Sequence, residues 1–192
     1  MNAEDTLTLW SQQLQAVMRR RSEGGGKPGL SSPEQVAGLS GLEVMQRLLA
    51  GGLPHPHISE TLDFSMVEVD AGRAVFQGTP QLMHYNPLGG VHGGWYATLL
   101  DSALGCAVQT SLPAGRAYTT AELSVNIVRG ATTRTGPLRA IGTVLHCGRQ
   151  LATAEARLVG PDGKLYAHAT TTCLVFEVAA RVAAGTAAAA TT

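Results

Sequence analysis

Apolar positions near the start of the chain recur at the spacing of an α-helix. They are Leu7, Trp10, Leu14 and Val17. This period predicts an amphipathic N-terminal helix within residues 1–21. Three arginines at 19–21 follow the last apolar position, where cations suit the negative end of a helix dipole. We interpret them as a solvated helix end rather than a patch for a partner or a membrane surface.

Glycine interrupts this pattern. Residues 22–31 have the composition of a flexible linker, so we expect the first helix to be a mobile or exchanged appendage. Further on, Ser40 and Glu43 form a capping box, which predicts a second helix ending near Gly51. We therefore assign residues 32–57 to a helical extension followed by a Pro/His loop.

From residue 58 onward the apolar period shortens from about 3.6 to about 2, the period of β-strands. One long apolar stretch, 95–112, separates two strand-like segments from four others. The strand-like segments are 62–69, 73–77, 118–128, 138–147, 151–159 and 164–177. This order predicts an α+β domain over residues 58–178, with an antiparallel sheet enclosing one central helix. Residues 179–192, rich in Ala and Thr, are expected to be unpacked.

Composition excludes several classes of protein. The length of 192 residues fits one domain with a short extension. With 44% hydrophobic residues, and 14 basic residues balanced by 14 acidic ones, neither a disordered polyelectrolyte nor a nucleic-acid-binding protein is indicated. No apolar run of about eighteen residues suits a membrane span, and the start lacks the apolar core of a secretory signal. We expect a cytoplasmic protein with neither a membrane nor a nucleic acid as partner.

No metal or cofactor is expected either. His55 and His57 have no third ligand at a matching spacing. The three cysteines form no CxxC pair and lie in apolar surroundings, which is typical of small buried hydrophobes in a reducing compartment. They are Cys106, Cys147 and Cys173.

Asp101 is the exception within the long apolar helix. Burial of a carboxylate raises its pKa and is costly unless the group is hydrogen-bonded, paired or catalytic. The residue is therefore either structural or catalytic.

Two glycines, Gly93 and Gly94, begin that helix. They leave its first N–H groups unobstructed at the positive end of the helix dipole, where an anion or a developing oxyanion would be stabilised. Eight residues separate Gly93 from Asp101, about 12 Å along a helix. One protomer is not expected to use both groups on the same carbon, whereas a two-fold partner could supply the second group.

Two sequence motifs resemble a known family. The segment NPLGGVHGGWYATLLD, from Asn86 to Asp101, resembles the signature of hotdog-fold acyl-CoA thioesterases of the phenylacetate-pathway (PaaI) and 4-hydroxybenzoyl-CoA type. GRQLATAEARLV, from Gly148, is similar to that family's penultimate strand. The resemblance covers about residues 58–176. It implies an antiparallel sheet wrapped around a central helix, a homodimer with active sites at its interface, often a homotetramer, and acyl-CoA as the substrate.

The resemblance also implies roles for individual residues. The Gly93 amide would bind the thioester carbonyl, and Asn86 would hold that carbonyl or the loop at the start of the motif, residues 86–92, hereafter the motif loop. Asp101, from the other protomer, would act as general base or nucleophile. Thr120 matches a hydroxyl that assists the acid in some members. His92 belongs to the motif and would either hydrogen-bond the loop or transfer protons.

Substrate-binding residues are predicted at two places. Gly94 and Trp95, at the start of the helix, would lie beside the acyl group, although packing between protomers explains Trp95 equally well. Arginines would bind the phosphates of CoA, with Arg149 as first choice and Arg129 and Arg134 behind it. The alternative is that these are ordinary strand-surface charges. The arginines of this half of the domain are Arg116, Arg129, Arg134, Arg139, Arg149 and Arg157.

Two functions of different classes remain open. The first is hydrolysis of an acyl- or aryl-CoA thioester to the carboxylate and free CoA, so that CoA is part of the substrate and not a cofactor. The second is a non-catalytic acyl-CoA-binding or sensor protein on the same fold. A hydratase would need an Asp/His or His/Glu pair that the sequence does not offer. The sequence does not define the acyl group.

Overall fold

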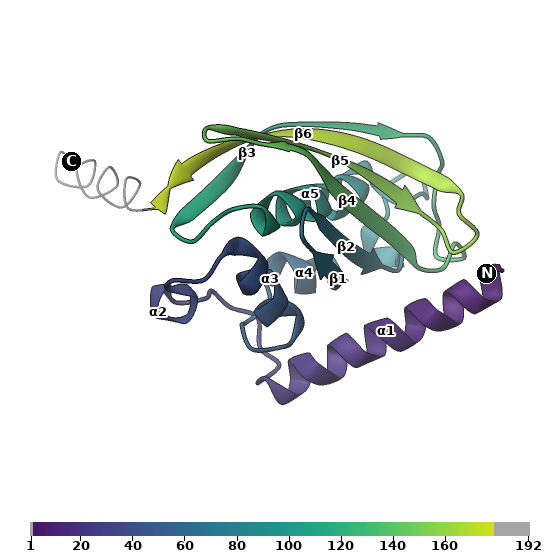
Figure 1. Cartoon of the computed structure of the whole chain (residues 1–192). Coiled ribbons are helices and arrows are strands. Elements are labelled where there is room, and N and C mark those ends of the chain that lie inside the picture. Colours follow the sequence, from purple (N-terminus) through teal and green to yellow (C-terminus); the bar gives the residue numbers. More distant parts are fainter. Residues whose placement is uncertain (1, 179–192) are drawn as a thin grey trace, which may run out of the picture.

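The computed structural model describes residues 2–178, in which a six-stranded antiparallel sheet curves around one long helix (Figure 1). The strands lie in the order β1-β2-β4-β5-β6-β3. Their bounds are β1 (Phe64–Asp70), β2 (Arg73–Gly78), β3 (Arg116–Ile127), β4 (Leu138–Cys147), β5 (Leu151–Val159) and β6 (Leu165–Glu177). The helix, α5 (Gly93–Thr110), packs against every strand. The predicted α+β architecture is confirmed. The expected tail, 179–192, lies outside the described residues.

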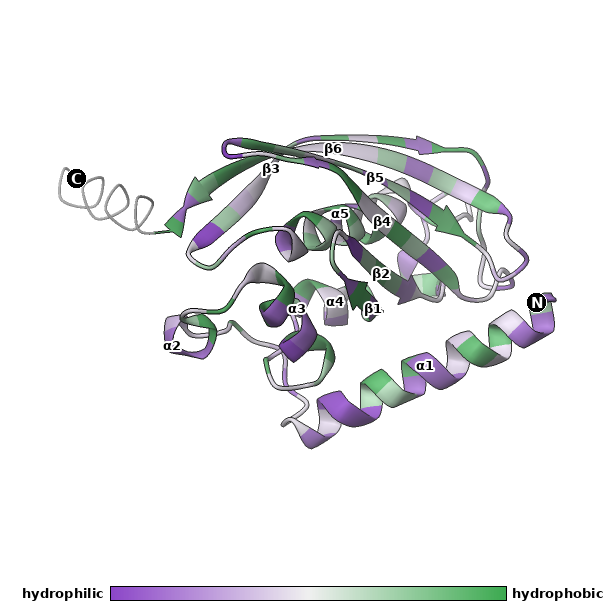
Figure 2. Cartoon of the chain, viewed as in Figure 1, coloured by the Kyte–Doolittle hydropathy of each residue, from purple (hydrophilic) through white to green (hydrophobic). Residues whose placement is uncertain are grey.

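The core is the contact between α5 and the concave face of the sheet. In Figure 2 α5 is largely apolar, while polar and apolar residues alternate along α1. Small side chains on the strands let the sheet approach the helix closely. At Gly142 in β4, an added Cβ would lie 2.3 Å from the carbonyl oxygen of Ala103 in α5. Residues of the helix that are completely buried include Leu99, Leu100, Ala103, Leu104, Ala107 and Val108.

Two helices of the N-terminal extension were predicted, whereas three short helical segments, one of which lies after β2, were not. The predicted pair is α1 (Ala3–Glu23), capped by Asn2, and α3 (Gly41–Leu49), capped by Ser40. The others are α2 (Pro33–Val36), α4 (His57–Thr61) and the 3-10 turn η1 (Leu82–His84). Helices of three to five residues show no amphipathic period, so their sequence gives little signal.

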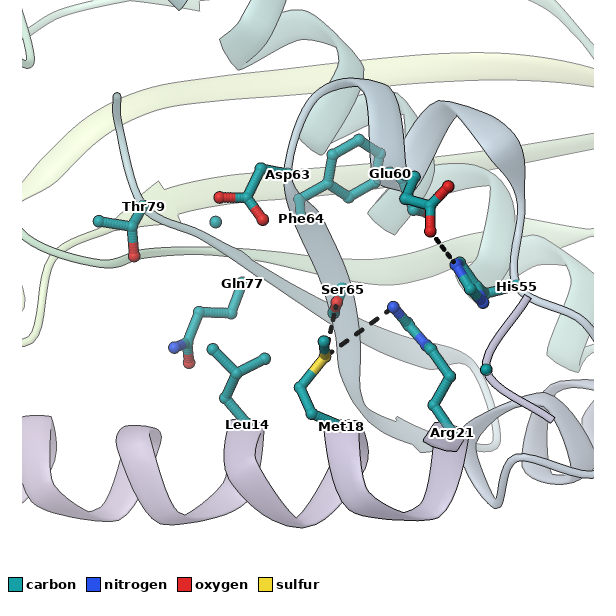
Figure 3. A pocket seen from close by; sticks show the side chains of 13 residues that line it. Leu14, Met18, Arg21, His55, Glu60, Asp63, Phe64, Ser65, Gln77 and Thr79 are labelled. Atoms are coloured by element: carbon teal, nitrogen blue, oxygen red, sulfur yellow. Dashed lines mark hydrogen bonds and ion pairs between the residues drawn. The ribbon is translucent and has the colours of Figure 1, made fainter. Parts of the chain in front are cut away.

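Helix α1 is not the mobile appendage that we expected. Its Trp10 and Val17 side chains are buried, and α1 packs against β1. A cavity of about 220 Å³ remains between α1 and the β1–β2 hairpin, with Leu14, Met18 and Arg21 on its helical wall (Figure 3). The expectation failed because the glycine-rich segment makes a close contact. An added Cβ at Gly24 would lie 1.8 Å from the carbonyl oxygen of Gly51.

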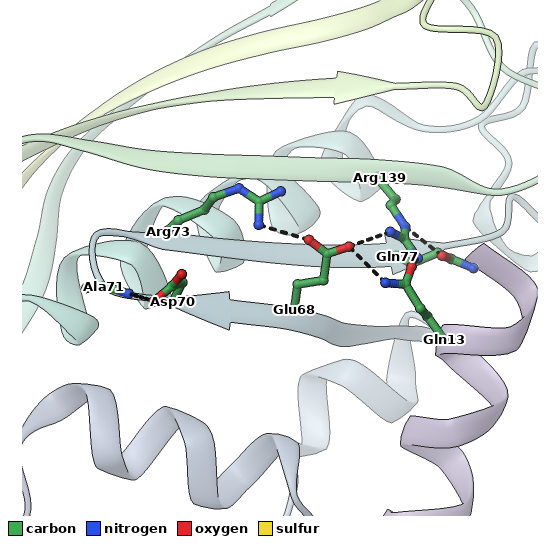
Figure 4. A network of polar contacts seen from close by, with 7 residues as sticks. All are labelled: Gln13, Glu68, Asp70, Ala71, Arg73, Gln77 and Arg139. Carbon is green, nitrogen blue, oxygen red and sulfur yellow. Dashed lines mark hydrogen bonds and ion pairs between the residues drawn. The ribbon is translucent and has the colours of Figure 1, made fainter. Parts of the chain in front are cut away.

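Arg139 of β4 anchors α1 to the sheet (Figure 4). Its guanidinium donates to Glu68 at 2.9 Å, Gln77 at 2.8 Å and Gln13 of α1 at 2.8 Å. The same group lies 4.5 Å from the ring centre of Trp10. Burial lowers the pKa of Arg139 to about 10, with the Glu68 charge acting in the opposite direction. This residue is structural and does not belong with the arginines proposed from the sequence for CoA.

Candidate active site

The side chains of Asp101, on α5, and Thr120, on β3, are in contact. The Thr120 hydroxyl donates a hydrogen bond to Oδ1 of Asp101 at 3.2 Å. A bulge in β3 between Thr120 and Glu122 shifts the register beside this contact, and bulges commonly re-aim side chains near functional sites. Burial raises the pKa of Asp101, while the hydrogen bond from Thr120 acts to lower it. A half-buried carboxylate with a raised pKa is a better proton acceptor near neutral pH.

The N-terminus of α5 carries the donor side of the site. His92 is the N-cap, and its Nδ1 accepts a hydrogen bond from the Gly94 amide at 2.8 Å. The Gly94 N–H is therefore already engaged. The Gly93 N–H has no hydrogen-bond partner within residues 2–178. Of the two predicted glycines, Gly93 is the one whose amide remains able to bind an anionic oxygen.

Asn86 organises the loop that leads into α5. Its Oδ1 accepts from the backbone N–H of Leu88 at 2.9 Å and of Gly90 at 3.3 Å. The backbone N–H of Asn86 donates to the Gly90 carbonyl at 2.8 Å. Of the two roles that the resemblance implied for Asn86, the contacts are those of a residue that holds the motif loop.

A cavity of about 380 Å³, hereafter the α5 cavity, adjoins the first turns of α5. Trp95, although only 2% exposed, contributes to its wall and donates from Nε1 to the Leu62 carbonyl at 3.0 Å. Leu62, His84, Tyr85 and Thr98 of this wall were not predicted from the sequence, because their spacing shows no motif. The lining residues are Leu62, Met83, His84, Tyr85, His92, Gly94, Trp95 and Thr98.

Asp101 and the α5 cavity lie along one side of the same helix. Gly94, Thr98 and Asp101 stand at positions i, i+4 and i+7, which share a helical face. Asp101 follows Thr98 by three residues, a rise of about 4.5 Å. The Gly93 amide is about 12 Å from Asp101 along the axis. One chain therefore holds the Asp101 carboxylate and the Gly93 amide at separate positions along α5, and it does not bring the two groups together.

The candidate arginines for CoA do not converge within one chain. Arg129 and Arg134 are exposed in the segment between β3 and β4, next to the motif loop, where the Arg129 carbonyl accepts from the Tyr96 hydroxyl at 3.4 Å. Arg149 is exposed in the β4–β5 hairpin. The ten residues of β4 lie between these places, a length of about 34 Å.

Other chemistry is poorly supported in this region. Burial raises the pKa of the Cys106 thiol to about 12, and the Asp101 charge adds to the effect, so the thiol stays protonated. Within residues 2–178, no three His, Cys, Asp or Glu side chains gather as a metal site requires. No helix in that range is long and apolar enough to cross a membrane.

The fold and the family that matches the chain place it among the thioesterases of the hotdog class. The model of the thioesterase superfamily matches residues 88–167, which include most of the motif loop, α5 and β3 to β5. No curated protein matches the chain.

One solved structure supports the same family, and two others at lower identity share the fold. A Ralstonia eutropha protein, assigned to the thioesterases and described as phenylacetic acid degradation-related, is 31% identical over 67% of this chain and 97% of its own, with a TM-score of 0.61. The Escherichia coli PaaI protein, from the phenylacetic acid degradation operon, is 22% identical over 62% of this chain and 83% of its own, with a TM-score of 0.57. A Haemophilus influenzae thioesterase is 18% identical, covering 71% and 91%, with a TM-score of 0.61. The chain belongs to the hotdog-fold thioesterase superfamily.

Proposed function

We propose that this protein is an acyl-CoA thioesterase that hydrolyses an acyl or aryl thioester to the carboxylate and free CoA. The observation that carries the proposal is the half-buried carboxylate of Asp101, hydrogen-bonded by Thr120, on a helix whose N-terminus offers the Gly93 amide. A thioester carbonyl is electrophilic enough for a positioned carboxylate and one oxyanion donor to suffice.

In the general-base route, the Asp101 carboxylate takes a proton from water while the water oxygen bonds to the thioester carbon. The carbonyl oxygen becomes an oxyanion that accepts a hydrogen bond from the Gly93 N–H. Collapse of this intermediate breaks the C–S bond. The CoA sulfur then receives the proton held by Asp101, and the carboxylic acid product loses its remaining proton to solvent and departs as the carboxylate. In the alternative route, Asp101 attacks the carbon itself and expels the CoA thiolate, which takes a proton from solvent, and water then hydrolyses the resulting anhydride.

A homodimer would complete this site. Strand β3 forms an outer edge of the sheet over twelve residues and exposes Thr120 and Ile127 on the face that points toward α5. A long exposed edge is a template for pairing with a second copy. We expect two-fold pairing along β3 to bring Asp101 of one protomer toward Gly93 of the other. A homotetramer would then be a pair of such dimers.

The CoA phosphates are assigned to arginines on both protomers. Arg129 and Arg134 flank the motif loop of the protomer that supplies Gly93, whereas Arg149 lies at the far end of the sheet and would act from a different protomer. Reversal of charge at such a residue should raise KM more than it lowers kcat.

The decisive test is Asp101→Asn assayed for thiol release on phenylacetyl-, benzoyl- and straight-chain acyl-CoAs. We expect kcat to fall by about 10²- to 10⁴-fold, the usual contribution of a general base. Ser102→Ala, a change at the next residue of α5, should keep its activity. A folded and fully active Asp101→Asn protein would overturn the proposal. Tight binding of acyl-CoA without thiol release by the wild type would favour the alternative, a non-catalytic acyl-CoA sensor.

A further inference from the structure

The cavity between α1 and the β1–β2 hairpin, hereafter the α1 cavity, is separate from the candidate active site (Figure 3). Its lining residues fall between positions 14 and 79, ahead of the segment 88–167 that matches the thioesterase superfamily, and none of them lines the α5 cavity. The polar side chains of its wall are Arg21, His55, Ser59, Glu60, Asp63, Ser65, Gln77 and Thr79. The α1 cavity is therefore a polar cavity built by the N-terminal extension and the first hairpin.

Arg21 brings a positive charge to the α1 cavity without a carboxylate partner. Unlike Arg19 and Arg20, which are exposed as expected of a solvated helix end, Arg21 is half-buried. Burial lowers its pKa, with the charge of Glu60 acting in the opposite direction. Within residues 2–178 no carboxylate lies within 4 Å of its guanidinium, which donates to the Met18 sulfur, a weak acceptor, at 3.9 Å. A partly desolvated cation of this kind is stabilised by an anion.

The Arg21 nitrogens are open to a ligand. Within residues 2–178, the side-chain nitrogens and oxygens that are enclosed and have no partner are His84 Nε2 and Arg116 Nε. Nε and Nη2 of Arg21 also lack a partner in this range but are not enclosed, so water can reach them. In Figure 3 the guanidinium extends from α1 toward Ser65 of β1. An anion in the cavity can therefore contact the guanidinium directly.

Asp63 and Glu60 bring negative charge to the same wall. Asp63 accepts a hydrogen bond from the Gln81 side-chain amide, and no cation lies within 4 Å of its carboxylate in the described part of the chain. Glu60 lies 3.5 Å from Nε2 of His55. Burial and the charge of Arg21 lower the pKa of that imidazole against the effect of Glu60, so the ring is neutral at pH 7. A carboxylate accepts up to about four hydrogen bonds, so both carboxylates have room for a further donor.

We propose that the α1 cavity binds a small amino acid as a zwitterion, with its carboxylate at Arg21 and its ammonium group at Asp63 or Glu60. The volume of about 220 Å³ equals the space of about seven water molecules at about 30 Å³ each, which suits a molecule of about that many non-hydrogen atoms. A simple anion would face the two carboxylates, and a simple cation would face Arg21, so a ligand that carries both charges complements this wall best. The inference does not depend on the proposed function, because binding is measured without a thioester.

The test is calorimetric titration of the full-length protein at pH 7 with three amino acids that differ in the separation of their charges. They are L-alanine, β-alanine and γ-aminobutyrate. The matched compounds with a single charge are propionate and ethylammonium for the first two, and butyrate and propylammonium for the third. At least one amino acid should bind once per protomer with a Kd below about 1 mM, and its single-charge relatives should bind at least about tenfold more weakly.

Variants of the wall assign the binding to this cavity. Arg21→Met keeps an unbranched side chain without the charge and should raise the Kd by about tenfold or more. Asp63 has a left-handed backbone with φ of 49°, which Asn also adopts, so Asp63→Asn removes the charge and keeps the conformation. At least one of Asp63→Asn and Glu60→Gln should weaken binding to a similar extent. Arg20→Met and Asp70→Asn, at exposed residues outside the cavity wall, are the matched controls.

Three outcomes would overturn the inference. If none of the amino acids binds to the wild type at up to about 10 mM, the cavity holds water only, whether or not the variants fold. If propionate or butyrate binds as tightly as the matched amino acid, the site is one for simple anions. If a folded Arg21→Met protein binds the amino acid as the wild type does, the ligand lies elsewhere on the molecule.

Discussion

The guanidinium of Arg139 lies 4.5 Å from the ring centre of Trp10, so strand β4, in the middle of the sheet, contacts the N-terminal helix α1 directly. The cation rests on the aromatic face while its nitrogens bond to three side chains. Cation–π contacts of this kind strengthen when water is excluded. Helix α1 is thereby part of the folded domain surface, and its attachment can be measured.

Arg139→Met should lower the free energy of unfolding by about 3 kcal/mol, because it removes one partner of a largely buried ion pair and leaves acceptors without donors. Urea denaturation at pH 7 and a fixed protomer concentration would measure the loss. Arg157→Met is the matched control, since Arg157 is exposed on β5. Equal stability of the two variants would contradict the role assigned to Arg139.

Glu68 should make the stability of the protein sensitive to acid. Burial acts to raise its pKa, but the hydrogen bond and charge of Arg73 and the charge of Arg139 outweigh it, and the pKa falls below the ordinary 4.5. A depressed pKa in the folded state contributes stability above the unfolded value, and this is lost as the pH falls through the folded value. Glu68→Gln should therefore flatten the decline in stability between about pH 5 and pH 3. Glu155→Gln, at an exposed residue of β5, is the matched control.

Gly24→Ala tests the contact between the ends of α1 and α3. The new methyl would collide with the Gly51 carbonyl, so we expect a loss of about 1–3 kcal/mol in the free energy of unfolding. Trypsin should also cleave faster at the arginines of residues 19–21. Gly130→Ala is the control, because an added Cβ there has nothing within 4 Å. If both variants have the stability and the trypsin cleavage rate of the wild type, the close contact between Gly24 and the Gly51 carbonyl is contradicted.

Thr120→Val should change how activity depends on pH. In the wild type the hydrogen bond from Thr120 stabilises the charged form of Asp101. Without it, the pKa of that carboxyl should rise further, and the acidic limb of the kcat/KM profile should move to higher pH. Thr120→Ser keeps the hydroxyl and should keep the wild-type limb. An unmoved limb in a folded Thr120→Val protein would show that the hydroxyl does not act on Asp101 during catalysis.

Local patterns in the sequence predicted the strands of the sheet and its central helix. Strands β4 and β5 have the predicted bounds, and the central helix begins at Gly93, two residues before its apolar stretch, because the His92 side chain caps it. The contact between Thr120 and Asp101 followed from a family motif and could not follow from periodicity, since a bulge sets the register of β3.

Contacts between distant segments account for what the sequence did not predict. Arg139 resembled the other strand arginines, and only the fold brings it to Glu68 and Gln13. The separation of Arg149 from Arg129 likewise depends on the direction of β4. The unpaired charges of Arg21 and Asp63 line one cavity because α1 packs against β1. The division of the chain at residues 21, 31 and 57 stays a prediction.

The two outer strands of the sheet differ in what surrounds them, and this difference limits assembly. Strand β1 is packed by α1, α3 and α4, while β3 leaves its outer side exposed. A sheet with two open edges can grow without end by adding copies head to tail, as in fibres. With a single usable edge, two copies that pair by a two-fold axis cover each other's β3, and growth of the sheet stops at the dimer. The helices packed against β1 would thus limit the sheet-to-sheet association that leads to aggregation.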